Sequence, residues 1–208
     1  MITKLQQKII AVFAGNILEK HTIRRLSQII KKNYRNTYES VQDLIKNKIL
    51  VKKRIGRADV CSLDLSQENS INPVIIAEDL RKLEFKKKYS GINILLNELN
   101  SKFEKYTSFF CLIVFGSYAS MTAREKSDLD LLIIINNYKN KNDFIKEINA
   151  SQITSIVKIN PIVILEKEFK DMLGDKKEIN VGKETLKKHI IFFNSELYWQ
   201  LVKNEIKN

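Results

Sequence analysis

The stretch that decides the fold of this chain is FGSYASMTAREKSDLDLLIII, Phe115–Ile135. An apolar run, Phe109–Phe115, leads into it, and five consecutive apolar residues, Leu131–Ile135, end it. Short apolar runs of this kind are typical of buried strands. The segment therefore predicts a strand, a Gly-Ser turn, a short helical link and a second strand. That second strand begins at two acidic residues, Asp128 and Asp130.

The two acidic residues are expected to share one face of the strand, because side chains at positions i and i+2 point the same way. Two carboxylates held close together repel each other unless a cation or a shared proton compensates. Oxygen ligands suit Mg²⁺, which commonly takes one or two carboxylates together with substrate phosphates. Asp128 and Asp130 are therefore candidate metal ligands. In the alternative interpretation, both only end the strand in solvent.

Gly116 and Ser117 follow the first strand directly and open the helical link. The backbone N–H groups at such a strand-to-helix turn are free to bind an anion. Glycine lets the backbone approach the anion closely, and the serine hydroxyl adds a further ligand. The pair therefore predicts a phosphate-binding turn beside the two acidic residues.

Gly116-Ser117-Tyr118-Ala119, followed by Ser127-Asp128-Leu129-Asp130, resembles the signature of polymerase-β-type nucleotidyltransferases, and most of all that of the minimal nucleotidyltransferase domains. That signature reads Gly-Ser-x-Ala-x-Gly, five residues, then Ser-Asp-x-Asp, and this chain keeps its spacing. The resemblance covers residues 107–208 and implies an α/β domain with a mixed sheet. It implies transfer of a nucleoside monophosphate from ATP or another triphosphate to a hydroxyl acceptor. In these roles Asp128 and Asp130 hold Mg²⁺ and serve catalysis, while Gly116, Ser117 and Ser127 bind the nucleotide.

Two positions of the signature differ from the family pattern. Met121 stands where the family has its second glycine, and Ser120 stands where the family often has a basic residue. A methionine there either packs harmlessly or narrows the approach of the nucleotide.

The larger departure is the third carboxylate of the family, which activates the attacking group. The next strand candidate, Ser155–Leu165, contains no Asp or Glu, and Asn160 or Ile162 stands where the acid is expected. Glu166 and Glu168 share the parity of these positions but fall at or beyond the strand end. The loss weakens the case for catalysis more than the case for binding of a metal and a nucleotide.

The N-terminal third of the chain is strongly basic. The formal net charge is +12 over 208 residues, and residues 1–70 carry 14 Lys or Arg against 6 Asp or Glu. A basic region of this kind predicts affinity for polyanions such as nucleic acid. The alternative is a lysine-rich composition that serves solubility.

Helical spacing predicts a helix over residues 1–14, a second capped by Thr22, and a third capped by Asn36 together with Glu39. Two β-rich runs within Ile49–Leu65 flank Gly56 and predict a hairpin. The apolar residues expected on the buried faces of the second and third helices are Ile23, Leu26, Ile29, Ile30, Val41, Leu44 and Ile45.

Three helices followed by a hairpin with a basic tip resemble a winged helix-turn-helix domain, over residues 1–66. In that family the third helix enters the major groove and the wing lies on phosphates or in a minor groove. The resemblance implies that two sets of residues face DNA. At the N-terminal end of the third helix these are Tyr34, Arg35, Asn36, Tyr38, Glu39 and Gln42, and on the wing they are Lys52, Lys53, Arg54 and Arg57. Winged helices also mediate protein contacts, so that interpretation stays open.

The fold class expected for the whole chain is α+β, with a helical connector over residues 67–106 between the two domains. Cys61 and Cys111 match no metal spacing and are expected to be reduced core residues of a cytoplasmic protein. No signal pattern or membrane span is expected. Two functions remain: a Mg²⁺-dependent transferase coupled to DNA binding, or a nucleotide-sensing or dimerising regulator without turnover. The second includes an antitoxin-like protein with a toxin-type partner, and a homodimer is possible in either.

Overall fold

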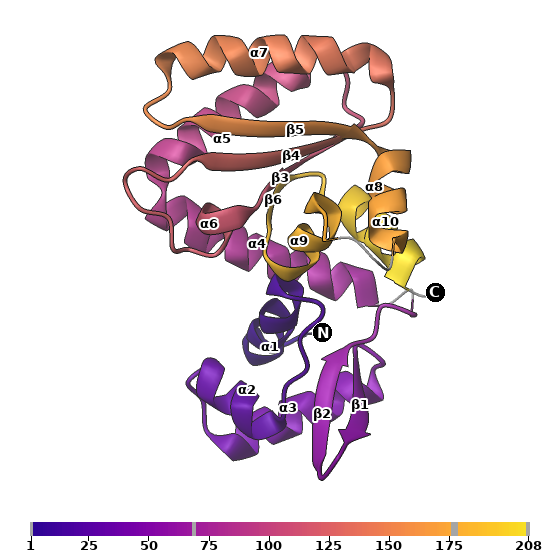
Figure 1. The fold of residues 1–208 in the computed structure, drawn as a ribbon. Helices are drawn as coiled ribbons and strands as arrows, with labels where there is room; N and C mark the ends of the chain where they lie inside the picture. The colour runs from indigo at the N-terminus through magenta and orange to yellow at the C-terminus, as the bar shows by residue number, and fades with distance from the viewer. Residues whose placement is uncertain (1, 68–69, 176–178, 207–208) are drawn as a thin grey trace. The chain divides into compact units, whose positions relative to one another are not determined.

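The computed structural model describes residues 2–67, 70–175 and 179–206. The chain forms two compact units, the first ending at Arg81 and the second beginning at Lys82. Helix α4, Ile71–Lys88, runs across this boundary (Figure 1). The predicted connector, residues 67–106, contains this helix and the following one, α5, which spans Ser90–Phe103. Within the described residues, no helix has both the length and the apolar content needed to cross a membrane.

Three helices and an antiparallel hairpin make up the first unit up to residue 63. The elements are α1 (Lys4–Gly15), α2 (Ile23–Ile29), α3 (Tyr34–Lys46), β1 (Leu50–Ile55) and β2 (Ala58–Leu63). The strands pair from Leu50 with Leu63 to Ile55 with Ala58. Gly56 takes a φ of +58° in the turn between them, a conformation that glycine adopts without a steric cost. The predicted order of three helices and a hairpin is confirmed.

The capping predictions have mixed outcomes. The Thr22 hydroxyl accepts a hydrogen bond from the Arg25 amide at 3.2 Å and caps α2 as predicted. The prediction for α3 is wrong, because Asn33 is the capping residue and accepts from the Asn36 amide at 2.8 Å. The helix therefore starts three residues earlier than predicted, and Asn36 lies inside its first turn.

The buried faces of these helices are narrower than predicted. Leu26, Val41 and Leu44 are buried, whereas Ile29 is 38% exposed. Helix α2 has only seven residues, so it buries about one turn of side chains.

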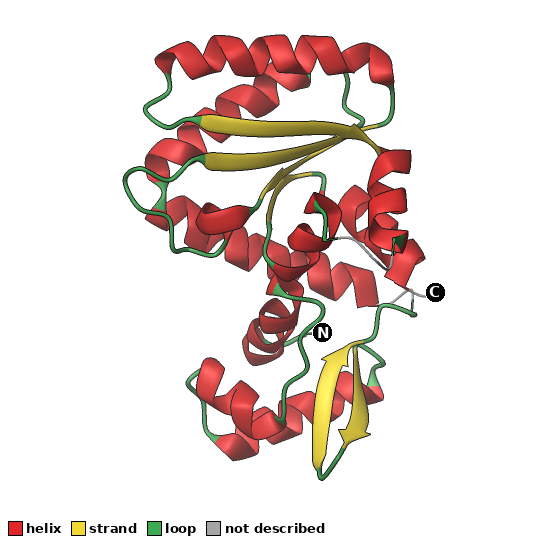
Figure 2. Cartoon of the chain, viewed as in Figure 1, coloured by secondary structure: helices red, strands yellow, loops and turns green. Residues whose placement is uncertain are grey.

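The second unit contains a mixed four-stranded sheet with helices on both faces (Figure 2). Its strand order is β5-β4-β3-β6, in which β4 and β5 are parallel and the other pairs are antiparallel. The strands are β3 (Phe110–Val114), β4 (Leu129–Ile135), β5 (Ile159–Leu165) and β6 (Ile190–Phe193). The helices after α5 are α6 (Gly116–Ala119), α7 (Lys141–Thr154), α8 (Glu166–Gly174), α9 (Val181–Lys187) and α10 (Ser195–Ile206), and a short 3-10 turn, η2 (Tyr138–Asn140), precedes α7.

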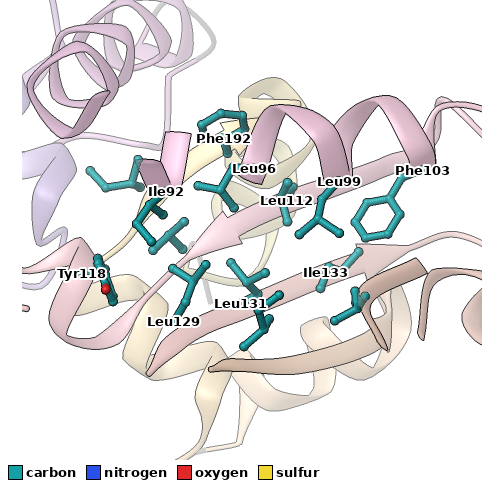
Figure 3. Close-up of a cluster of buried hydrophobic side chains, with 14 of the residues drawn as sticks. Ile92, Leu96, Leu99, Phe103, Leu112, Tyr118, Leu129, Leu131, Ile133 and Phe192 are labelled. Atoms are coloured by element: carbon teal, nitrogen blue, oxygen red, sulfur yellow. The ribbon is translucent and has the colours of Figure 1, made fainter. Parts of the chain in front are cut away.

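One face of the sheet carries a large cluster of buried apolar side chains. Figure 3 shows the α5 side chains Ile92, Leu96, Leu99 and Phe103 directed toward strand residues that include Leu112 and Leu131. The Phe103 ring stacks on that of Phe144 in α7, with centroids 4.2 Å apart. The opposite face is covered by α8, which packs on β4 and β5, and by α10, which packs on β3. Cys61 and Cys111 are both buried, as predicted, and neither forms a disulfide with a described residue.

The packing of this core can be tested at Phe103, because its ring is fully buried and contacts the rings of both Phe110 and Phe144. We expect Phe103→Ala to lower the free energy of unfolding of the second unit by about 3–5 kcal/mol, since it removes apolar contacts and leaves a cavity. Urea unfolding followed by circular dichroism measures the change. Ile156→Ala is the control, because Ile156 is 97% exposed and its loss should change stability by less than about 0.5 kcal/mol. Similar losses for both variants would contradict the packing described.

Candidate functional site

The two acidic residues lie at one edge of the sheet, where β4 begins. Asp128 immediately precedes the strand and Asp130 is its second residue. The parallel pairing with β5 places Asn160 directly beside Asp130. One step earlier, the Leu129 amide donates to the Lys158 carbonyl at 2.8 Å, so Lys158 lies beside Asp128. Two acidic residues at the start of β4 therefore face a lysine and an asparagine on the neighbouring chain segment.

Each carboxylate has one polar partner from this segment. The Lys158 Nζ lies 3.2 Å from Asp128 Oδ2, and Asn160 Nδ2 donates to Asp130 Oδ1 at 3.0 Å. The Asp128 and Lys158 side chains are 43% and 74% exposed. An ion pair this exposed contributes little to stability, so a cation can replace it at small cost. These contacts reduce the repulsion between the carboxylates while leaving both accessible.

Gly116 touches the second acidic residue. Its φ is +66°, in the left-handed region, and a Cβ at this position would collide with Asp130 Oδ2. The backbone is held there by the Phe115 amide, which donates to the Asp130 carbonyl at 3.1 Å. Glycine is therefore required for two reasons, the backbone conformation and the approach of the carboxylate. As predicted, the Gly-Ser turn lies beside the acid pair.

Ser117 and Ser127 occupy different environments around this turn. Ser117 is half-buried within α6, and its carbonyl accepts from the Thr122 amide at 3.0 Å. The Ser127 hydroxyl accepts from the Arg124 amide at 2.9 Å and closes the tight turn that leads into Asp128. This contact positions the acid pair, while nucleotide binding by Ser127 stays a prediction.

Met121 has a left-handed backbone conformation, which glycine adopts easily. This conformation explains why the family pattern has a glycine at this position. The φ of Met121 is +58°, a left-handed conformation that costs a residue with a Cβ about 1–2 kcal/mol. Its side chain packs against the core of the sheet, and its carbonyl accepts from Lys88 Nζ at 2.6 Å. Packing and this hydrogen bond offset the strain, so the turn keeps its shape without glycine.

The structure shows why neither glutamate after β5 can serve as the third acid. In the parallel ladder, Leu165 pairs with Ile135 at the end of the strands opposite to Asp130. Glu166 begins α8 at that far end, and Glu168 Oε2 accepts from the Leu165 amide at 2.7 Å. In the stretches of chain that the structure describes, no group of three or more His, Cys, Asp or Glu residues could hold a metal.

The donor set nevertheless fits a hard divalent cation. Asp128 and Asp130 offer carboxylate oxygens, and Asn160 offers an amide oxygen once its amide turns over. Oxygen donors with several coordination positions left open for water and phosphate are typical of Mg²⁺ sites. The sequence did not lead us to Lys158 as a site residue. A signal was present, because Lys158 lies two residues before Asn160 and both side chains therefore share one face of the extended chain.

The residues predicted to face DNA lie on the first unit. Tyr34, Arg35, Asn36 and Tyr38 are exposed, and Gln42 is half-buried. One cavity of about 400 Å³ brings together four of the predicted residues, Tyr34, Tyr38, Gln42 and Lys52.

Several of the predicted DNA-contact residues have acidic partners. Arg35 Nε pairs with Glu39 at 3.1 Å, while Lys52 and Arg54 lie 3.5 and 3.7 Å from Asp59. Lys53 and Arg57 are exposed near the tip of the hairpin, and no ion pair of theirs is seen in the described residues.

Comparison with known proteins gives one match. Residues 97–198 match the family model described as polymerase beta, nucleotidyltransferase. No curated protein and no solved structure matches the chain. The matched segment contains the Gly116 turn, the acid pair and Asn160. In this part of the chain, the protein is similar to the nucleotidyltransferases of the polymerase β family.

Proposed function

We propose that the second unit is a Mg²⁺-dependent nucleotidyltransferase that moves a nucleoside monophosphate from a triphosphate to a hydroxyl acceptor. The observation that carries the proposal is the contact between Gly116 and Asp130, which joins the turn proposed to bind phosphate to the acid pair at the start of β4. If the two acidic residues only ended the strand in solvent, no glycine would be needed beside the Asp130 carboxylate.

Each residue has a distinct role in this proposal. Asp128, Asp130 and the amide oxygen of Asn160 would hold Mg²⁺, which when bound neutralises phosphate charge and polarises the reacting phosphoryl group. Backbone N–H groups at Gly116 and Ser117 orient the phosphates. In the transfer, the acceptor oxygen bonds to the α-phosphorus, and the bond to the bridging oxygen of pyrophosphate breaks.

The reaction also requires a group that accepts the proton lost by the acceptor hydroxyl. Asn160 can accept a hydrogen bond but, as an amide, takes no proton at neutral pH. Asn160 and Asp128 are open to solvent, so water receives the proton. The reaction is therefore expected to be slow compared with that of an enzyme that has a third carboxylate.

For the first unit we propose DNA binding in the manner of a winged helix. The support is the exposed N-terminal half of α3, the basic hairpin and the excess of Lys and Arg in residues 1–70. Phosphate contacts supply affinity without sequence information.

A second function draws on two observations, Asn160 in place of an acid and the strained Met121. In this alternative the second unit binds a nucleotide without turnover and regulates the first, as a dimer or with a toxin-type protein partner.

Nucleotidyl transfer is tested with each α-³²P-labelled triphosphate, Mg²⁺ and cell extract as the source of acceptor. We expect label to be transferred by the wild type and lost in Asp128→Asn/Asp130→Asn, which keeps the size of both side chains. Asp143→Asn/Asp171→Asn removes the same charge from α7 and α8 and should remain active. Magnesium-dependent nucleotide binding without any transfer would favour the alternative function.

Restoring a carboxylate at position 160 tests the role given to Asn160. We expect Asn160→Asp to raise the rate of transfer by about a hundredfold, because a positioned general base contributes a factor of this order. The rate would also become pH-dependent as the new carboxylate ionises. Asn149→Asp, at an exposed position of α7, adds the same charge away from the site and should leave the rate unchanged. A lower rate in Asn160→Asp would contradict this role.

DNA binding is tested through its dependence on salt. We expect Lys53→Ala/Arg57→Ala to reduce the slope of log K against log salt by about 1.8, because each lost phosphate contact removes about 0.9. Fluorescence anisotropy with duplex DNA measures the slope. The control is Lys4→Ala/Lys8→Ala, which removes the same charge from α1. An unchanged slope in the hairpin variant would indicate that the hairpin does not contact DNA.

A further inference from the structure

A second cavity lies beside the Gly116 turn, within the second unit, with a volume of about 360 Å³. Its lining comes from the turn and from the region around α9. The residues are Gly116, Ser120, Ile179, Glu184, Lys187 and Lys188. The cavity therefore brings charged side chains of a late helix to the turn proposed to bind phosphate.

The sheet topology places this cavity on one particular side of the acid pair. Gly116 lies two residues after the end of β3, and Lys188 lies two residues before the start of β6, where Ile190 pairs with Val114. In the strand order β5-β4-β3-β6, Asn160 lies on β5 and Asp130 on β4. Along the edge of the sheet the order is therefore Asn160, Asp130, Gly116 and Lys188.

The cavity and the acid pair also belong to the same face of the sheet. Leu129, Leu131 and Ile133 pack into the core beneath α5 and α7, so Asp130, with the opposite parity, points to the other face. That face is covered by α8 and α10, and α9 packs against α8. The charges of α9 therefore lie on the side of the sheet to which the carboxylates point.

The charges in the cavity favour an anion. Lys187 and Lys188 are exposed, and no ion pair involving either is seen among the described residues. Among the lining residues that the structure describes, Glu184 is the one carboxylate, beside the two ammonium groups of Lys187 and Lys188. The ammonium group of lysine is a compact charge that binds phosphate in many proteins.

We propose that Lys187 and Lys188 bind the β- and γ-phosphates of the nucleoside triphosphate, the part that leaves as pyrophosphate. This inference rests on the proposed function of the second unit. The α-phosphate then lies in front of the contact between Gly116 and Asp130, and the acceptor approaches from the opposite side, past Asn160. When the bond from the α-phosphorus to the bridging oxygen breaks, its electron pair leaves with pyrophosphate. The two ammonium groups neutralise that added charge.

Glu184 has a defined consequence in this arrangement. A carboxylate in the same cavity repels the phosphate chain and lowers its affinity. Replacing it with glutamine removes the repulsion and keeps the size of the side chain. If the cavity binds an anion, Glu184→Gln should therefore bind the phosphate chain more tightly than the wild type does. Weaker binding would contradict an anion site.

The test uses inorganic tripolyphosphate as the probe and the full chain as the protein, with affinity measured by calorimetry at several salt concentrations. We expect Lys187→Ala/Lys188→Ala to weaken binding by about tenfold or more, since charge-assisted hydrogen bonds are lost. Lys146→Ala/Lys167→Ala removes the same charge from exposed positions of α7 and α8 and should bind like the wild type. Glu184→Gln should bind more tightly.

A site-resolved readout separates this cavity from the basic first unit, which also attracts polyanions. Tripolyphosphate should protect Lys187 and Lys188 from an amine-reactive reagent, as measured by mass spectrometry of peptides. Protection together with the selective loss of affinity would support the subsite even if the wild type transferred no nucleotide. Equal losses in both double-lysine variants, or unprotected Lys187 and Lys188, would overturn it.

Discussion

The contact between the Gly116 backbone and the Asp130 carboxylate is the constraint on which the site depends. It joins the end of β3 to the start of β4 and leaves no room for a side chain at position 116. The hydrogen bond from the Phe115 amide to the Asp130 carbonyl fixes the same two segments through the backbone. Any residue with a Cβ at position 116 would have to push the acid away, so the turn and the carboxylate form one unit.

The positions that differ from the family pattern affect chemistry more than architecture. Met121 keeps the left-handed backbone that a glycine would adopt, and its side chain packs against the core. Asn160 keeps the place beside Asp130 and a hydrogen bond to it, but an amide cannot take a proton. Among the described residues, the site therefore retains groups that would bind a metal and phosphate, and β5 places no carboxylate beside Asp130 to act as a base.

The four strands also separate the two substrates proposed for this site. Asn160 and Lys158 stand at the start of β5, on one side of the acid pair, and the charged residues of α9 stand before β6 on the other. A phosphate chain attracted to Lys187 and Lys188 leaves the β5 side open for an acceptor. In the proposed reaction, the direction of transfer across the sheet follows from the strand order.

The sequence by itself determined the local elements, because apolar periodicity, Gly56 and the Thr22 cap act over a few residues. It also determined the acid pair and the Gly-Ser turn, since both lie within 15 residues of one another. It failed at the start of α3, where Asn33 and Asn36 offer the same capping chemistry three residues apart. Only the tertiary structure decided that Asn160 lies beside Asp130, that Lys158 pairs with Asp128, and that α9 lines a cavity at Gly116. These contacts join segments 30 or more residues apart, and their positions depend on strand pairing, which no local pattern specifies.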